Sequence, residues 1–199
     1  MFIVLEGIDG SGKSSILPAA REFYERRGRA VTVARDPGST ALSGRIRELL
    51  LTPADTPIAP TAETLLYCAA RAQMLAEIIL PALARNETVI CDRFYWSTLA
   101  YQGEAGGGAA LDALVVAAAG GLRPDLTILL DLPASVAMTR LSGALDRIER
   151  RGVDYLERVR RRYLQIIGEL PAPQKIILNA AAPREIVHAE LLARLGSES

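Results

Sequence analysis

The sequence predicts an α/β fold in which helices cover both faces of a five-stranded parallel sheet. Three observations lead to this prediction. Short apolar runs alternate with longer helical patterns along the chain, the runs are continuously apolar, and a glycine-rich loop follows the first run. Strands that are buried on both faces have continuous apolar sequences, and parallel strands need a crossover connection, which is usually a helix.

Five runs rich in Val, Ile and Leu fit the buried strands. In order they are FIVLE (2–6), AVTVA (30–34), TVIC (88–91), LTILLDL (126–132) and KIILN (175–179). Helical patterns occupy the intervals at about 13–27, 42–51, 61–81, 96–102 and 109–119, then from 134, up to 168 and from 184. Pro18 should remove a backbone hydrogen bond from the first helix and kink it. The glycine-rich segment 103–108 is expected to be flexible.

Length and charge limit the function classes. The 199 residues contain no repeat and no long linker, so we expect a single domain, 1–199. Basic and acidic residues both number 23, which gives no sign of a nucleic-acid partner or an anionic membrane surface. Cys68 and Cys91 lie in apolar runs without metal-binding spacing, which predicts reduced thiols. No secretory leader is recognised, so we expect a soluble cytoplasmic protein with no membrane partner.

The stretch EGIDGSGKSS, residues 6–15, fits the phosphate-binding P-loop pattern G-x-x-x-x-G-K-S. Its glycines allow positive φ angles, so that successive N–H groups converge on an anion at the start of a helix. Lys13 is expected to reach the β- and γ-phosphates, and the Ser14 hydroxyl one Mg²⁺ position. The residues expected to hold the triphosphate are Gly7, Asp9, Gly10, Ser11, Gly12, Lys13, Ser14 and Ser15.

Polar residues follow the predicted strands, at the sheet edge where ligands bind in such folds. After the third strand, Asp92 could hold the Mg²⁺ through water and Arg93 could grip a second phosphate; the alternative is a structural ion pair. The Asp9 carboxylate, beside phosphates, should face the acceptor. Tyr67 with Arg71, and Thr98 with Gln102, have i,i+4 spacing. They could stack on and hydrogen-bond a base; alternatively Tyr67 is a core ring and Arg71 a surface charge.

Six phrases carry a resemblance to the bacterial thymidylate kinase family across nearly the whole chain. They are EGIDGSGKSS, RDPGST, LLYCAARAQ, DRFYWSTLAYQG, RPDLTILLDLP and LDRIERRGVDYLERVRRRYLQI. DRFYWSTLAYQG resembles the family signature D-R-Y-x-x-S-x-x-A-Y-Q-G, which is more specific than a P-loop. The resemblance implies a three-layer P-loop NTPase fold with a short lid at about 140–152. It also implies ATP- and Mg²⁺-dependent phosphorylation of dTMP to dTDP, and a homodimer.

The resemblance also implies roles for single residues. It places Tyr67 against the thymine ring, Arg71 on a base oxygen, and Thr98 and Gln102 at the base edge. Tyr101 would crowd a ribose 2′-OH, and Asp9 would contact the 3′-OH. The acceptor phosphate would be held by Arg35, Arg47 and Arg93.

Phosphoryl transfer needs positioning and charge neutralisation, and a phosphate acceptor needs no general base. The predicted catalytic residues are Asp9, Lys13, Arg93 and Arg147. Arg147, in LDRIE, matches the family pattern as the lid cation; alternatively the lid arginines only solvate a mobile loop. The lid lacks an arginine that bacterial forms often have before its glycine, and RDPGST departs from R-E-P-G-G-T. Two other functions stay open: a kinase of another nucleoside monophosphate and a non-catalytic nucleotide-binding switch.

Overall fold

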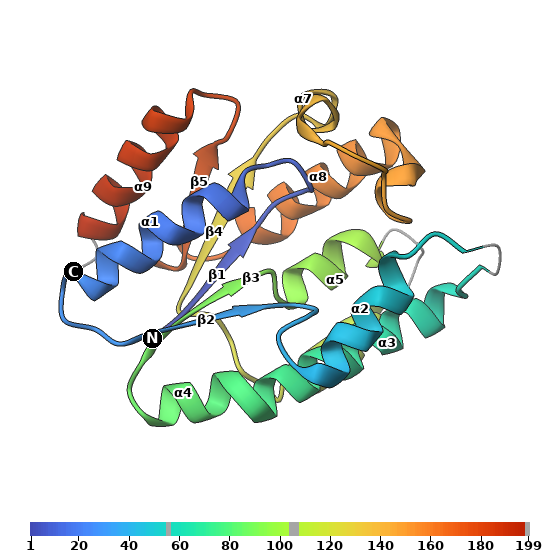
Figure 1. The fold of residues 1–199 in the computed structure, drawn as a ribbon, viewed down its shortest axis with the longest axis horizontal. Coiled ribbons are helices and arrows are strands. Elements are labelled where there is room, and N and C mark those ends of the chain that lie inside the picture. The colour runs from blue at the N-terminus through green and yellow to red at the C-terminus, as the bar shows by residue number, and fades with distance from the viewer. Residues whose placement is uncertain (55–56, 104–107, 198–199) are drawn as a thin grey trace.

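The computed structural model describes residues 1–54, 57–103 and 108–197. Its five described strands form one parallel sheet in the order β2-β3-β1-β4-β5 (Figure 1). Their bounds are β1 Phe2–Glu6, β2 Val31–Arg35, β3 Thr88–Asp92, β4 Leu126–Asp131 and β5 Lys175–Asn179. The three central strands are almost wholly buried, whereas β2 and β5 at the edges are partly exposed. The predicted parallel sheet is therefore confirmed.

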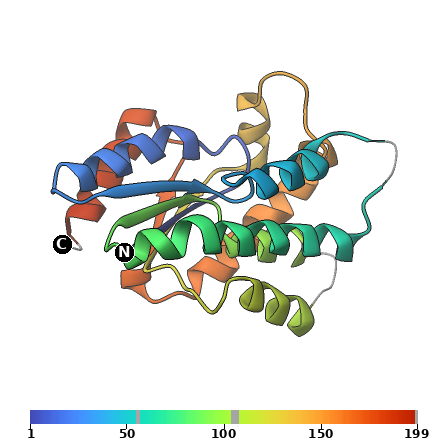
Figure 2. The same ribbon diagram turned by 60° about the horizontal axis from the view of Figure 1, so that its bottom comes forward.

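Helices cover both faces of the sheet. The α-helices of the described residues are α1 Lys13–Glu25, α2 Ala41–Leu51, α3 Pro60–Met74, α4 Leu80–Ala84, α5 Tyr95–Tyr101, α6 Gly108–Ala118, α7 Ala134–Arg140, α8 Val153–Gly168 and α9 Arg184–Ser197. Figure 2 shows α1 on one side of the sheet and the long α3–α4 helix on the other. The α1 side also carries α9, and its core includes Ile16, Phe23 and Leu191. This arrangement gives the three layers expected for a doubly covered sheet.

The register of the strands gathers polar residues at one edge of the sheet. Asp92, at the end of β3, pairs with Arg35 of β2 on one side and with Leu5 of β1 on the other. Farther along, Asp131 of β4 pairs with Asn179 of β5. Because all the strands are parallel, their carboxyl ends and the loops after them meet along this rim.

The long helix expected to end near Pro81 continues to Ala84. A π-helical segment, η1 (Leu75–Ile79), interrupts it, and the Leu80 N–H donates to Leu75 O five residues earlier. Pro81 therefore stands in the first turn of α4, where a missing N–H costs little. In the described part of the chain, Pro60–Ala84 is one candidate for a membrane span by length and composition alone. In this fold its Met74 and Ile79 are fully buried in the protein core.

Two other local expectations concern Pro18 in the first helix and the glycine-rich segment 103–108. The first helix runs through Pro18 to Glu25, and the kink expected at this proline stays a prediction. Of the glycine-rich segment expected to be flexible, residues 104–107 lie outside the described residues.

The segment predicted to be the lid, about 140–152 and here called the lid segment or lid, lies between α7 and α8 and contacts the end of α2. It contains the short 3₁₀ helix η3 (Glu149–Arg151). The turn before η3 is fixed by Asp146, whose Oδ1 accepts from the N–H groups of Ile148 and Glu149 at 2.8 and 2.9 Å. The Arg147 N–H donates to Leu51 O at 3.0 Å, which attaches the lid to the last turn of α2.

Candidate active site

The loop between β1 and α1 has the conformation that its glycines predict. Gly7, Gly10 and Gly12 have φ angles of 141°, 79° and 97°. A Cβ on Gly10 would lie 2.5 Å from the Ala137 carbonyl oxygen of α7, so a larger residue cannot fit without displacing that helix. The Lys13 ammonium lies inside the loop and donates to Gly7 O at 2.8 Å and Ile8 O at 3.0 Å. Burial lowers the pKa of Lys13 to about 8.

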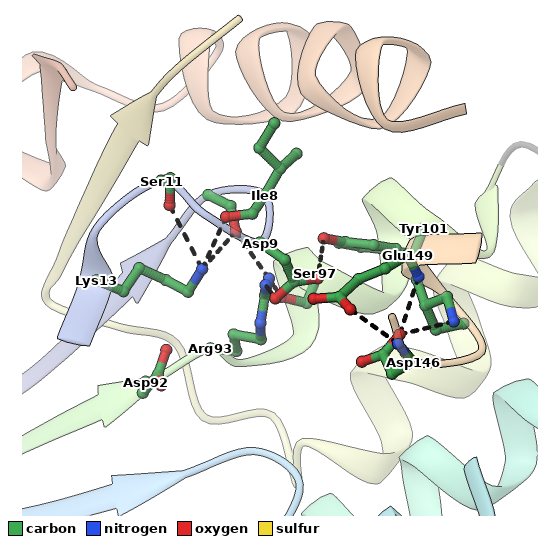
Figure 3. Close-up of polar contacts among 12 residues, drawn as sticks. Ile8, Asp9, Ser11, Lys13, Asp92, Arg93, Ser97, Tyr101, Asp146 and Glu149 are labelled. Atoms are coloured by element: carbon green, nitrogen blue, oxygen red, sulfur yellow. Dashed lines mark hydrogen bonds and ion pairs between the residues drawn. The ribbon is translucent and has the colours of Figure 1, made fainter. Parts of the chain in front are cut away.

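Arg93, directly after β3, is the second cation at the rim. Its backbone is in the left-handed region with φ 69°, which is a strained conformation for a non-glycine residue. Its NH1 donates to Gly7 O at 2.8 Å, the same oxygen that Lys13 contacts. Its NH2 donates to Asp9 Oδ1 at 2.7 Å. Figure 3 shows Lys13 and Arg93 converging on the loop, with Asp9 beside Arg93. Two cations, one at the start of α1 and one directly after β3, therefore meet at one carbonyl group.

The Asp9 carboxylate lies between this pair and the neighbouring helix α5. Burial disfavours its charge, but Arg93 and Lys13 more than offset that effect and hold the pKa of Asp9 well below its usual range. Tyr101 OH donates to Asp9 Oδ2 at 3.2 Å. Asp9 is therefore an ionised acceptor at neutral pH, as expected for a group that faces a hydroxyl.

A cavity of about 520 Å³ opens beside Asp9 and Arg93. Nine residues predicted for the substrate line it: Asp9, Arg35, Arg47, Tyr67, Arg71, Arg93, Thr98, Tyr101 and Gln102. Asp36, Pro37, Leu51 and Ser97 also line it, with Asp146 and Ile148 of the lid. Residues from six separate parts of the sequence thus line one cavity.

The deep end of the cavity holds a buried ion pair. Arg71 is 1% exposed, so the alternative of a surface charge is wrong. Its Nε donates to Asp36 Oδ2 at 2.6 Å, and its NH2 donates to Thr98 Oγ1 at 2.7 Å. Arg71 NH1 and Asp36 Oδ1 are buried and have no hydrogen-bond partner among the described residues. Burial raises the pKa of Asp36. The free NH1 donor fits a ligand oxygen in this cavity.

The shallow side of the cavity carries the other two predicted arginines. Arg47 NH1 donates to Pro37 O at 3.1 Å, which draws α2 onto the loop after β2. Arg35 is more exposed and lies 3.6 Å from Asp92. Asp92 and Arg93 do not pair with each other; Asp92 faces Arg35, and Arg93 faces Asp9.

Arg147 lies elsewhere, on the α2 and α3 side of the lid. Its Nε donates to Leu50 O at 2.6 Å, and its NH2 donates to Glu63 Oε2 at 2.5 Å. Leu50 belongs to the last turn of α2, where carbonyl groups lack partners within the helix and a cation is favourable. In this structure, therefore, Arg147 joins the lid to two helices, and its guanidinium is bonded to groups outside the P-loop.

The remaining predicted donor-side residues lie around the start of α1. Ser14 is exposed, and Ser15 Oγ donates to Gly12 O at 2.8 Å. A second cavity, of about 520 Å³, is lined by Ser11, Gly12, Ser15, Ile16, Leu130, Arg140, Ala180, Ala182, Arg184 and Val187. It shares no lining residue with the cavity of Arg71. Residues of the P-loop thus line two different cavities: Asp9 lines the first, and Ser11 and Gly12 line the second.

Several functional contacts were missed by sequence reasoning. Glu6 is fully buried and accepts from Phe94 N, Ser97 Oγ and Tyr163 OH at 2.9, 2.7 and 3.0 Å. Burial raises its pKa. The signal for Glu6 was an acidic residue at the end of an apolar strand. Tyr163 belongs to the apolar face of α8 and gave no signal, although its OH also accepts from Arg93.

The chain is similar in sequence to known proteins over nearly its whole length. The sequence model of the thymidylate kinase family matches residues 5–191. The chain is 44% identical to the thymidylate kinase of Desulforudis audaxviator over 200 residues, which cover 98% of this chain and 90% of the relative. It is 44% identical to that of Pseudomonas putida, over 98% of this chain and 94% of the relative. It is 47% identical to that of Pseudomonas fluorescens, over 86% of this chain and 84% of the relative.

Proposed function

Because this chain belongs to the thymidylate kinase family, we propose that it transfers the γ-phosphoryl group of ATP to dTMP, forming dTDP and ADP. One observation supports this most directly. Lys13 and Arg93 each donate to Gly7 O at 2.8 Å, so a phosphate-binding cation on the P-loop adjoins a cation of the acceptor cavity. Two phosphates bound by these groups would be close enough to react.

The proposed mechanism depends on positioning and charge. Lys13 would neutralise the β- and γ-phosphates, and Arg93 would hold the acceptor phosphate in line with the γ-phosphoryl group. Arg35 and Arg47 would add positive charge around that acceptor. Asp9 would accept from the 3′-OH of the sugar while keeping Arg93 in place. The acceptor phosphate is itself the nucleophile, so none of these side chains needs to remove a proton.

The residues also fit a Mg²⁺ ion. Asp92 Oδ1 is buried and has no hydrogen-bond partner in the described part of the chain, and the Ser14 hydroxyl is exposed at the start of α1. Mg²⁺ in such sites takes one or two protein oxygens and completes its shell with water and phosphate. When bound, Mg²⁺ would offset the negative charge of the triphosphate. Ser14 would hold the ion directly, and Asp92 through water.

The base would lie deep in the acceptor cavity. Tyr67 would stack on the thymine ring, and Arg71 NH1 would donate to a base oxygen, since it is a buried donor with no described partner. Thr98 and Gln102 would read the base edge. Tyr101 would crowd the 2′ position, because its OH is held by Asp9 at the sugar side.

A lid cation completes the proposal. Arg147 would stabilise the charge on the moving phosphoryl group, a role in which an arginine contributes on the order of 10³- to 10⁵-fold in rate. To do so it must exchange Glu63 and Leu50 for the phosphate, which requires a movement of the lid.

We also infer a homodimer in the cytoplasm, without a nucleic-acid or membrane partner. Leu42 and Leu49 of α2 and Leu65 of α3 are 47%, 58% and 49% exposed, which is consistent with a covered face on these two packed helices. Equal numbers of basic and acidic residues offer no overall attraction to nucleic acid or anionic lipid. Sedimentation of the purified protein would measure its oligomeric state.

An assay of ADP release tests the activity. The protein is given ATP and Mg²⁺ with dTMP, dUMP, UMP, CMP or AMP in turn, and the Lys13→Met variant reports any contaminating kinase. We expect the highest kcat/KM with dTMP. Turnover of AMP or CMP well above dTMP would indicate a different kinase, and binding of ATP and dTMP without product would indicate a non-catalytic protein.

A further inference from the structure

Glu63, on α3, is a buried carboxylate at the border of the acceptor cavity. Its side chain is 3% exposed. Its Oε1 accepts from Gln102 Nε2 at 2.8 Å, and its Oε2 accepts from Arg147 NH2 at 2.5 Å. Arg151 NH2 lies 3.7 Å from Oε2. A carboxylate paired in this way with arginine only accepts hydrogen bonds.

This contact fixes the orientation of the Gln102 carboxamide. An amide has one oxygen, which accepts, and one NH₂ group, which donates, and the two ends can exchange by a flip. Because Glu63 only accepts, Gln102 turns its NH₂ toward Glu63. Gln102 also lines the acceptor cavity. With its NH₂ turned to Glu63, the amide oxygen at the other end of the carboxamide is the atom that it would offer to a ligand there. The cavity thus receives an acceptor from Gln102.

Arg71 supplies the complementary donor. Its NH1 is buried without a hydrogen-bond partner among the described residues, and Arg71 is one of the residues that line the same cavity. A ligand that satisfies both groups needs a hydrogen-bond donor for Gln102 and an acceptor for Arg71. Thymine and uracil have an N3–H donor beside the O4 acceptor. Cytosine has the reverse pattern, with an N3 acceptor beside an amino donor, and would leave both protein groups unpaired.

We propose that Glu63 is a specificity-determining positioning residue: it holds the Gln102 amide oxygen toward the base and thereby selects N3–H pyrimidines over cytosine. The proposal rests on the proposed function, since it assumes that a nucleotide base occupies this cavity. Glu63 itself touches no substrate. Its effect on selectivity comes from the polarity that it imposes on Gln102.

The test compares dTMP with 5-methyl-dCMP, which has the same methyl group, sugar and phosphate but the opposite donor and acceptor pattern. We expect the wild-type kcat/KM to favour dTMP by about 100-fold or more, because a site built to hydrogen-bond one pattern rejects the other strongly. In Glu63→Gln, the new carboxamide can accept from Gln102 or donate to it, so the flipped Gln102 amide is no longer excluded. The preference for dTMP should then fall by about 10-fold or more.

Arg151→Gln is the matched control. It removes the more distant partner of Glu63 but keeps the carboxylate, so its preference should stay within about 2-fold of wild type.

If Glu63→Gln does not fold, Gln102→Met removes the acceptor at similar size and should lower the preference in the same way. An unchanged preference in the folded variant, even with lower overall activity, would overturn the proposal. Failure of the wild type to phosphorylate dTMP would instead overturn the proposed function.

Discussion

At the scale of single residues, the site places like charges together and balances them with buried acids. Lys13 and Arg93 share the Gly7 carbonyl oxygen, an arrangement that their mutual repulsion disfavours. Asp9 offsets it through its ion pair with Arg93 at 2.7 Å. Burial disfavours the Arg93 charge, yet the acids around it, Asp9 first, raise its pKa above the ordinary value. The rim is therefore ready for phosphate before a nucleotide arrives.

The lowered pKa of Lys13, about 8, predicts a pH dependence of ATP binding. A phosphate beside the ammonium raises its pKa, so binding above pH 8 must take up a proton, and affinity should fall as pH rises through this value. Calorimetry at about pH 7 and pH 9, in buffers with different ionisation heats, measures the uptake. Lys175→Arg, which changes the other lysine, should leave the uptake unchanged, and Lys13→Arg should abolish it. Equal affinity and no uptake at the higher pH would contradict this assignment.

At the scale of elements, Arg147 makes the closest contacts between the lid and helices α2 and α3. Arg147 bonds to Glu63 of α3 and to Leu50 O at the end of α2, and its own N–H donates to Leu51 O. These contacts satisfy carbonyl groups at a helix C-terminus and neutralise a buried carboxylate. The same residue is proposed as the catalytic cation, so its two roles need to be separated experimentally.

Arg147→Ala separates the two roles by kinetics. As the catalytic cation, Arg147 acts only in the transition state, so we expect kcat to fall on the order of 10³-fold while the KM for dTMP changes little. Arg150→Ala is the control, because its Nε bonds only to Leu145 O, within the lid, among the described contacts. A raised KM with kcat retained would mean that Arg147 serves only to attach the lid. A loss of kcat in Arg150→Ala alone would assign the catalytic role to Arg150.

At the scale of the whole molecule, the sequence was most informative where the signal is local. Continuous apolar runs predicted the strands, and the spacing of Gly7, Gly12 and Lys13 predicted the loop conformation. Contacts between distant segments could not be predicted. Glu6, at the end of β1, and Tyr163, on α8, are 157 positions apart and meet only because α8 packs against the sheet. The end of the long helix was placed too early, since a π-helical segment before Pro81 leaves no local pattern.

The same limit applies to the acceptor cavity. The i,i+4 spacing placed Tyr67 and Arg71 on one helix, but only the fold brings Asp36 to Arg71 and Glu63 to Gln102. Under the proposed function, these acids decide which atoms of Arg71 and Gln102 face the ligand. Selectivity for the base would then depend on contacts between distant segments, whereas phosphate binding would depend on the local sequence of the loop.

The central claim is that ATP and dTMP meet across the rim that Lys13 and Arg93 share. A dinucleotide in which a polyphosphate chain joins adenosine to thymidine tests it directly, since such a molecule can fill both cavities at once. We expect it to inhibit competitively against ATP and also against dTMP, and to bind more tightly than either nucleotide. Competition with only one of the two substrates would mean that their sites are separate, which would contradict the account.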